Sequence, residues 1–549
     1  MLAVDRFVIV IEMALPMPTS ISRAAIAAAV FAAAFAACAA PVSAAPSEFR
    51  RGLAGTIATL DPQKATTFVE ASALGDLFEG LVTFDARGAL IPGAATSWTV
   101  SPDGLTYTFA VREGRWSNGD PLRAGDFVFA FRRLFSPATG APTAGLFDAI
   151  LGARAAMKGG DPAKIGVAAP DDRTLTIRLA RPTPYFLALL ALPAASPLDP
   201  AQVARDGADF ARAGNLATDG AYRLVDFAPN GAITLARDPA FHDAAHVAID
   251  VERIDTIEDR AQGLRRFEAG ALDAYDDAPS GDLAGLRARL GDRLRVSPFP
   301  GTFYLALDTR HPPFDDARVR RALSLAVDRG TLARKVWGGA MAPATGFVPP
   351  GLGGYAPAQG PWIGPSPAAR IAEARRLLHA AGYGEGGKPL TVEIRCNASE
   401  NNRATMVQIA ADWARVGVGA SVRMSDLKSH FAFLRSGAPY DVARAGWVSD
   451  YPDAQDFLFL LGKDAGPLDY SHYADPVFED LMARAARETV PAARFALLRA
   501  AETKALADGP VIPLLDYRSI DLVSPRVVGW IDNPLGKHLT RWLRLAPGS

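Results

Sequence analysis

Cysteine is scarce in this chain. Its 549 residues contain two, Cys38 and Cys396. Cys38 lies in an apolar N-terminal stretch that we expect to be removed, which leaves Cys396 alone in the mature chain. A single cysteine can form neither a disulfide framework nor a cysteine-based metal site, so both are excluded there.

An excess of charge is also lacking. Lys plus Arg number 58 and Asp plus Glu 59, a net charge of -1. Without a basic excess the chain has no means of holding a polyanion, so we expect no nucleic-acid partner. Hydrophobic residues make up 49%, enough for large cores. The length predicts two or three domains.

Motifs of common enzyme classes are absent. No G-x-S-x-G, H-E-x-x-H or phosphate-binding glycine loop occurs, and the seven histidines are scattered. His242 and His246 have a spacing that can bind metal on a helix, but they follow Asp238-Pro239, and we expect a solvated pair. The absence of these motifs is only weak evidence against an enzyme, and we expect no metal and no cofactor. A catalytic triad assembled from distant residues leaves no motif, so a secreted hydrolase stays an alternative.

Residues 1–44 have the features of a signal peptide. Arg23 precedes the apolar run 24–40, and Val42-Ser43-Ala44 is a small-residue cleavage site. The run is short for a membrane-spanning helix. We expect export. A weak lipobox at Phe35-Ala36-Ala37-Cys38 makes a lipid anchor at Cys38 the alternative.

The stretch Tyr440–Phe457, YDVARAGWVSDYPDAQDF, predicts a strand that ends in an acidic turn. Ala445 and Gly446 have so little bulk that another backbone can come close. Asp450 follows in the turn. Main-chain groups of such a strand can pair with an extended peptide, and the carboxylate can take its α-ammonium. The alternative is an ordinary buried strand that leads to a polar turn.

Several segments carry a family resemblance. They are TLDPQKAT from Thr59, DLFEGL from Asp76, FAVREGRWSNGDPLRAGDFVFAFRR from Phe109, TDGAY from Thr218, FDDARVRRALSLAVDR from Phe314, and DVARAGW-x-x-DY from Asp441. Together they resemble bacterial oligopeptide-binding proteins, the periplasmic receptors of peptide ABC importers. The resemblance covers essentially the whole mature chain. It implies an α/β fold of the bilobed periplasmic-binding type, with an extra inserted domain and a hinge.

The resemblance also implies roles for residues of the key stretch. Asp450 looks like the carboxylate that binds the peptide α-ammonium. Arg444 and Arg435 look like cleft arginines available to the peptide carboxylate. Ala445 and Gly446 would supply main-chain hydrogen bonds. For Arg444 the alternative is an ion pair with Asp441.

Further site residues are expected outside that stretch or at its end. Trp447 and Tyr517 would line side-chain pockets. Asn402 stands where some relatives place a basic residue that meets the carboxylate of longer peptides. Asp276, beside Asp277, stands where relatives often carry amides, so the pocket would favour cationic guests. An acidic surface turn is the alternative there.

The same resemblance implies domain boundaries. Lobe I would comprise 45–80, 199–298 and 519–549, an inserted small domain 81–198, and lobe II, with the ligand strand, 299–518. The hinge would lie at Ser297–Gly301 and Tyr517–Ser519.

The implied function is capture of short oligopeptides for an inner-membrane ABC permease, by a periplasmic monomer that does no chemistry. The alternatives are a narrower ligand on the same fold (a dipeptide, a murein peptide or an opine), a secreted hydrolase, or a peptide-holding chaperone.

Local patterns predict individual elements. Residues 98–111 alternate around Asp103-Gly104 and predict a hairpin. Asp126 and Asp315 are expected to cap helices. Helices are expected at 366–381, at 406–416 and at 478–506, the last broken near Pro491. A short buried strand is expected at 511–515, and a β-rich tail at 521–545.

Overall fold

The structure is a computed structural model that describes residues 46–228, 231–384 and 386–547. The chain divides into two units, 1–46 and 47–549. The predicted signal peptide and Cys38 lie outside the described residues. Within the described ranges, no helix is both long and apolar enough to span a bilayer.

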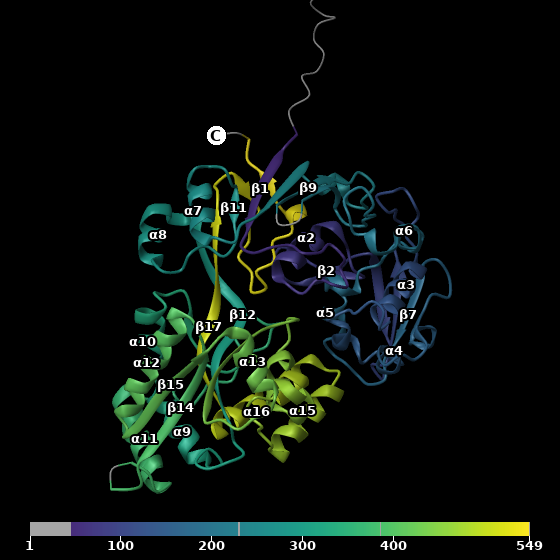
Figure 1. Cartoon of the computed structure of the whole chain (residues 1–549). Coiled ribbons are helices and arrows are strands. Elements are labelled where there is room, and N and C mark those ends of the chain that lie inside the picture. The colour runs from purple at the N-terminus through teal and green to yellow at the C-terminus, as the bar shows by residue number, and fades with distance from the viewer. Residues whose placement is uncertain (1–45, 229–230, 385, 548–549) are drawn as a thin grey trace, which may run out of the picture. The chain divides into compact units, whose positions relative to one another are not determined.

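One large mixed sheet organises residues 47–549. Its strand order is β15 (Val418–Ser425), β14 (Leu390–Asn397), β16 (Val442–Val448), β12 (Leu294–Leu307), β17 (Val511–Val523), β11 (Ala274–Tyr275), β1 (Glu48–Leu53), β10 (Val251–Thr256), β9 (Ala232–Arg237) and β8 (Tyr222–Phe227), with β13 (Ala342–Pro343) on β17. The two long strands β12 and β17 lie side by side and link the part of the sheet around β1 to the part around β14 (Figure 1).

The ladder between β12 and β17 is irregular at two places, between Pro298 and Thr302 and between Phe303 and Tyr304, and the first is the larger. Ser297 pairs with Ser519 and Pro298 with Arg518, but the next pair is Thr302 with Asp516. Residues 299–301 thus face Tyr517 alone, an irregularity that bends a strand. This interruption coincides with the predicted hinge, whose movement stays a prediction.

A second, four-stranded sheet contains β4 (Ala95–Val100), β5 (Thr106–Val111), β7 (Thr174–Arg178) and β6 (Val167–Ala168), in that order. The hairpin predicted around Asp103-Gly104 is confirmed as β4 and β5. Gly104 has a φ of 69° in its turn, a conformation that favours glycine. Two-stranded sheets are formed by β2 (Val82–Phe84) with β3 (Leu90–Pro92), and by β18 (Val527–Val528) with β19 (Arg544–Leu545).

Helices cover these sheets. They are α2 (Phe68–Leu77), α3 (Ala124–Leu134), α4 (Ala153–Met157), α5 (Phe186–Leu189), α6 (Pro200–Asp206), α7 (Arg260–Glu268), α8 (Leu283–Leu290), α9 (Ala317–Ala326), α10 (Arg329–Thr331), α11 (Pro367–Ala380), α12 (Glu400–Ala414), α13 (Leu427–Arg435), α14 (Gln455–Leu458), α15 (Pro476–Arg487) and α16 (Pro491–Asp508). The helix predicted at 366–381 and the break near Pro491 are confirmed.

Four local predictions were wrong. The cap of α9 is Asp316, not Asp315. Asp126, by contrast, does cap α3, from the third position of the helix, where its side chain accepts the N–H of Arg123. Helix α12 begins at Glu400 because the Ser399 hydroxyl caps it. The strand predicted at 511–515 extends to Val523. The tail predicted to be β-rich has mostly irregular structure.

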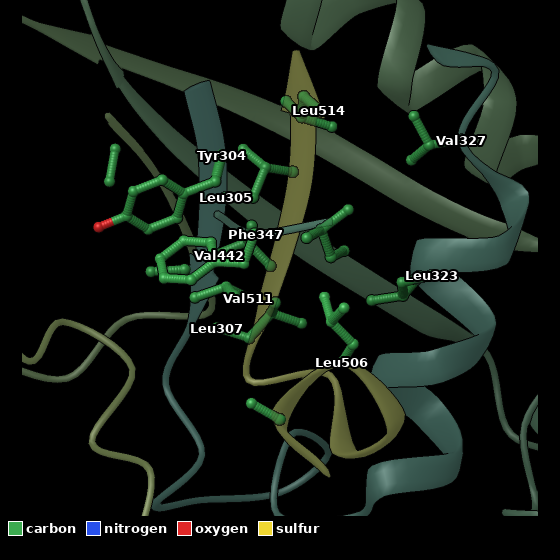
Figure 2. Packing of buried hydrophobic residues seen from close by; sticks show 14 of the residues in the cluster. Tyr304, Leu305, Leu307, Leu323, Val327, Phe347, Val442, Leu506, Val511 and Leu514 are labelled. Carbon is green, nitrogen blue, oxygen red and sulfur yellow. The ribbon is translucent and has the colours of Figure 1, made fainter. Parts of the chain in front are cut away.

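The largest apolar core holds the key strand in place. Tyr304, Leu305 and Leu307 of β12 lie in one cluster with Val442 of β16, with Val511 and Leu514 of β17, and with Leu323 and Leu506 (Figure 2). All are buried. Because tightly packed cores do not deform readily, β16 is fixed at its N-terminal end by Val442 and Ala443.

Candidate functional site

Strand β16 has an edge that is only partly paired. It runs antiparallel to β12 over its whole length, but it pairs with β14 only at Val442 and Ala443. The Ser449 N–H donates to the Pro300 carbonyl at 2.7 Å, on the β12 side. Since main-chain groups alternate between the two edges, Gly446 and Val448 direct theirs to the other edge. No strand among the described residues pairs with them there.

Gly446 lies beneath the phenol of Tyr517. A Cβ at this position would come within 2.8 Å of Tyr517 Oη. The same hydroxyl is 3.4 Å from Nη2 of Arg444, which donates to it. A larger residue at this position would displace the Tyr517 side chain. The glycine also leaves room for a second backbone.

Arg444 is held by aromatic rings. Its guanidinium lies 4.7 Å from the ring centre of Phe303 and 5.9 Å from that of Phe431. No ion pair joins it to a carboxylate in the described part of the chain, and its Nε has no hydrogen-bond partner. The alternative partner, Asp441, instead accepts the N–H of Glu393 at 2.8 Å. The guanidinium of Arg444 thus has no carboxylate partner among the described residues.

The turn after β16 is organised by Asp456, which the sequence analysis missed. Asp456 Oδ2 accepts the N–H of Asp450 at 2.8 Å and the indole N–H of Trp447 at 3.1 Å. Its side chain is 1% exposed. Burial, together with the charge of Asp450, raises the pKa of Asp456 well above its ordinary value. The spacing of six residues from Asp450 gave no recognisable signal.

Asp450 keeps some exposed surface, yet the surrounding protein removes enough water to raise the pKa of its carboxyl. No cation pairs with it within the described ranges. Asp450 is exposed by surface area, so solvent can reach this carboxylate, and a nearby ammonium would favour its ionised form.

A cavity of about 500 Å³ lies beside the open edge of β16. Val448, Tyr517 and Asp276 all line it, together with Phe68, Phe299, Trp337 and Asn401. The structure therefore gathers residues from β16, from β17 and from the segment after β11 around one space. Arg435 lies elsewhere, on a separate cavity of about 260 Å³ with Lys463 and His472.

Asn402 does not line the 500 Å³ cavity. Its side-chain amide donates to the carbonyl of Asn397 at 3.1 Å and to the Asn397 Oδ1 at 3.0 Å. These bonds fix the segment that leads into α12. The adjacent Asn401 faces the cavity instead.

The acidic pair in the cavity wall is largely neutralised. Asp276 accepts from Arg51 at 2.6 Å, and the Arg51 side chain is 2% exposed. Asp277 accepts from Arg260 Nε at 3.0 Å. Two arginines thus offset the two carboxylates from which we expected a preference for cationic guests. Asp521 also lines the cavity, and burial next to Asp276 raises its pKa to about 8.

The two histidines spaced four apart do not meet. Nε2 of His242 lies 2.8 Å from Glu79, whereas Nδ1 of His246 lies 2.5 Å from Asp243. Across the described residues, no three side chains of His, Cys, Asp or Glu gather as a metal site.

Comparison with known proteins gives a consistent set of matches. A family model described as bacterial extracellular solute-binding proteins, family 5 middle, matches residues 89–467. The chain is 33% identical over 492 residues to the periplasmic oligopeptide-binding protein OppA of Escherichia coli K12, covering 88% of this chain and 90% of that protein.

Two solved structures are similar over nearly their whole length. The periplasmic murein tripeptide-binding protein MppA, in its unliganded open form, is 32% identical, with a TM-score of 0.84, covering 91% of this chain and 98% of that one. OppA of Haemophilus influenzae in complex with RPPGFSPFR is 31% identical, with a TM-score of 0.72, covering 91% and 99%.

Proposed function

The chain belongs to family 5 of the bacterial extracellular solute-binding proteins, and on this premise we propose that it is the peptide-binding component of an ABC importer. Its fold is the α/β fold of the bilobed peptide-binding type. It is a binding protein and not an enzyme. A short peptide enters the cleft, is held, and is delivered to a permease.

The observation that carries this proposal is the open edge of β16 beside the 500 Å³ cavity. An extended peptide adds to this edge as a further strand, bonded to the main chain of Gly446 and Val448. Main-chain pairing does not depend on the guest's side chains. Peptides of different sequence can then bind, because the cavity has room for water around their side chains.

Charged groups near the strand fix the ends of the guest. Asp450 receives the α-ammonium, which would be costly to desolvate without a partner. Arg444, whose charge is uncompensated, receives a carboxylate through charge-assisted hydrogen bonds. Trp447 and Tyr517 shape the adjoining surface, whereas the side chain of Ala445 is fully buried in the core. Arg435 and Asn402 contact other parts of the fold and have no part in this mode of binding.

The wider proposal follows the family. The protein works in the periplasm as a monomer, exported by residues 1–44, with lipidation at Cys38 as the less favoured form. Lobe I comprises 45–80, 199–298 and 519–549, the inserted domain 81–198, and lobe II 299–518. The lobes close by bending at Ser297–Gly301 and Tyr517–Ser519, and an inner-membrane permease recognises the closed form.

Calorimetric titration of the purified protein tests the proposal. Prior unfolding and refolding strips bound ligand, after which a pool of tri- and tetrapeptides is titrated beside an N-acetylated pool. We expect one-to-one binding of free peptides that acetylation weakens. Asp450→Ala should weaken binding by about 2–5 kcal/mol, because it leaves a buried ammonium unpaired. Binding indifferent to acetylation contradicts the role of Asp450, and failure to bind any peptide contradicts the function.

A narrower ligand is the second candidate, favoured by the similarity to a murein tripeptide-binding protein. A murein tripeptide titrated in the same way separates the two. Binding of that peptide alone, with no response to the mixed pools, would replace the general receptor by a dedicated one.

A further inference from the structure

A small recess adjoins the peptide cavity on the side of α2. It has a volume of about 50 Å³ and is lined mainly by apolar groups, among them Phe68, Phe78 and Phe84. The hydroxyl-bearing residues Ser72, Thr83 and Ser196 also line it. One charged side chain in its wall, Lys537, has no opposite charge beside it.

The side chain of Lys537 is partly buried, and its ammonium is unpaired. In the described part of the chain no carboxylate lies within 4.0 Å of it and no acceptor bonds to it. Its Nζ lies 4.7 Å from the ring centre of Phe84, a weak substitute for a counterion. Burial alone lowers the pKa of Lys537 to about 8, so the side chain keeps its charge at neutral pH.

Arg51, the other cation that lines the recess, already has hydrogen-bond partners. Arg51 donates to Asp276 and to the carbonyl of His538. Of the two cations in this wall, Lys537 is therefore the one that could still bind an anion. A partly buried charge without a counterion is stabilised by an anion brought to it, and the described residues supply none to Lys537.

The loop that carries Lys537 is rigidly built. Asn533, which is buried, donates from Nδ2 to the carbonyl of Lys537 at 2.8 Å. Its Oδ1 accepts the N–H of Leu535 at 3.1 Å. The side chain of Asn533 thus closes the loop from within and fixes the backbone of Lys537 against the recess.

The recess and the peptide cavity share a wall. Phe68 lines both, and its ring meets that of Phe299 edge-on, with centroids 5.9 Å apart. Gly536, next to Lys537, lines the peptide cavity, and a Cβ there would come within 3.0 Å of the Phe299 ring. The shared Phe68 and the neighbouring residues Gly536 and Lys537 thus place the recess next to the space proposed for the peptide.

The size of the recess limits what it can hold. About 10–15 Å³ of such space holds one water, so 50 Å³ accommodates a few waters or a small terminal group. A carboxylate meets this limit and supplies the missing negative charge. Serine and threonine hydroxyls can donate to its second oxygen.

We propose that Lys537, in the recess bounded by Phe68 and Phe84, binds a carboxylate of the guest peptide. The inference rests on the proposed function, because it takes the guest to be a peptide in the adjoining cavity. Two sources offer the same chemistry, the C-terminal carboxylate and an Asp or Glu side chain. In this proposal Lys537 of lobe I contributes to the preference for acidic peptides, in addition to Arg444 of lobe II.

Matched peptides test this on the full-length mature protein. Tetra-alanine and penta-alanine, each as free acid and as C-terminal amide, report on the terminal carboxylate. Tetrapeptide amides with Glu or Gln at each position report on a side chain. Each set is titrated calorimetrically into the wild type, Lys537→Met and Lys537→Arg, after thermal melts show that the variants fold.

We expect the wild type to bind at least one acid about tenfold or more tighter than its neutral counterpart, as a charge-assisted hydrogen bond provides. Lys537→Met should abolish that preference without weakening the neutral peptide, and Lys537→Arg should retain part of it. The responding set identifies the source of the carboxylate. An undiminished preference in Lys537→Met, or no preference in the wild type, overturns the inference while peptide binding stands. Failure of every peptide to bind the wild type overturns the proposed function as well.

Discussion

The indole of Trp447 donates a hydrogen bond to Asp456, 3.1 Å away, and the same carboxyl oxygen accepts the N–H of Asp450. One buried side chain therefore fixes both the last large residue of β16 and the proposed ammonium ligand. Burial raises the pKa of Asp456 and so disfavours its charged form, and an amide in its place would keep the acceptor oxygen.

We expect Asp456→Ala to destabilise the protein by about 2–6 kcal/mol, because it leaves two donors unpaired at about 1–3 kcal/mol each. Asp456→Asn, which keeps an acceptor oxygen, should cost much less. Urea denaturation of both variants measures the difference. Equal losses would show that the charge of Asp456, and not its oxygen, holds the turn.

Gly446→Ala should destabilise the fold by about 1–3 kcal/mol, because the new methyl group would lie 2.8 Å from Tyr517 Oη. Removing that oxygen in Tyr517→Phe should relieve the conflict. A double-mutant cycle in urea is the measurement, with Tyr517→Phe as the control. Additive losses would mean that the methyl group meets the backbone and not the phenol.

Peptide affinity should decrease on acidification. The ionised form of Asp450 binds the ammonium, and desolvation raises the pKa of this carboxyl, so binding should weaken at a pH above the ordinary aspartate value of about 3.9. Titrations between pH 4 and 7 with a free peptide and its N-acetylated form provide the measurement. A parallel decline for both forms would place the titrating group elsewhere.

The raised pKa of Asp521 should make the free energy of unfolding depend on pH. Its pKa rises from about 3.9 in the unfolded chain to about 8 in the fold, so between these values the native state binds more protons. The free energy of unfolding should therefore fall as pH increases from about 4 to 8. Asp521→Asn removes this loss, and its stability relative to the wild type should rise from pH 5 to pH 8. A constant difference between the two proteins would contradict the assignment.

The sequence predicted much of the local structure because its signals act over a few residues. The hairpin around Gly104 and the break near Pro491 follow from the conformational limits of glycine and proline. The displaced cap at Asp316 shows the limit of such signals. Two adjacent aspartates can each cap a helix, and backbone geometry selects between them.

Contacts between distant residues were beyond that reach. No pattern in the sequence around Asp276 indicates that Arg51 is its partner. Arg51 lies 225 residues away in the chain and neutralises the Asp276 carboxylate. The acidic pocket expected from Asp276 and Asp277 therefore has little net charge. Lys537 likewise gained its importance only when folding brought Phe84 and Phe68 around it.

The sequence by itself determined the family, the strand at Val442–Val448 and the acidic turn that follows it, since these depend on motifs and on alternation within one segment. The tertiary structure alone decided which edge of that strand is open, which carboxylates are neutralised and which cation is left without a partner. Those properties depend on desolvation and on charges that approach from other elements, and both exist only once the chain has folded.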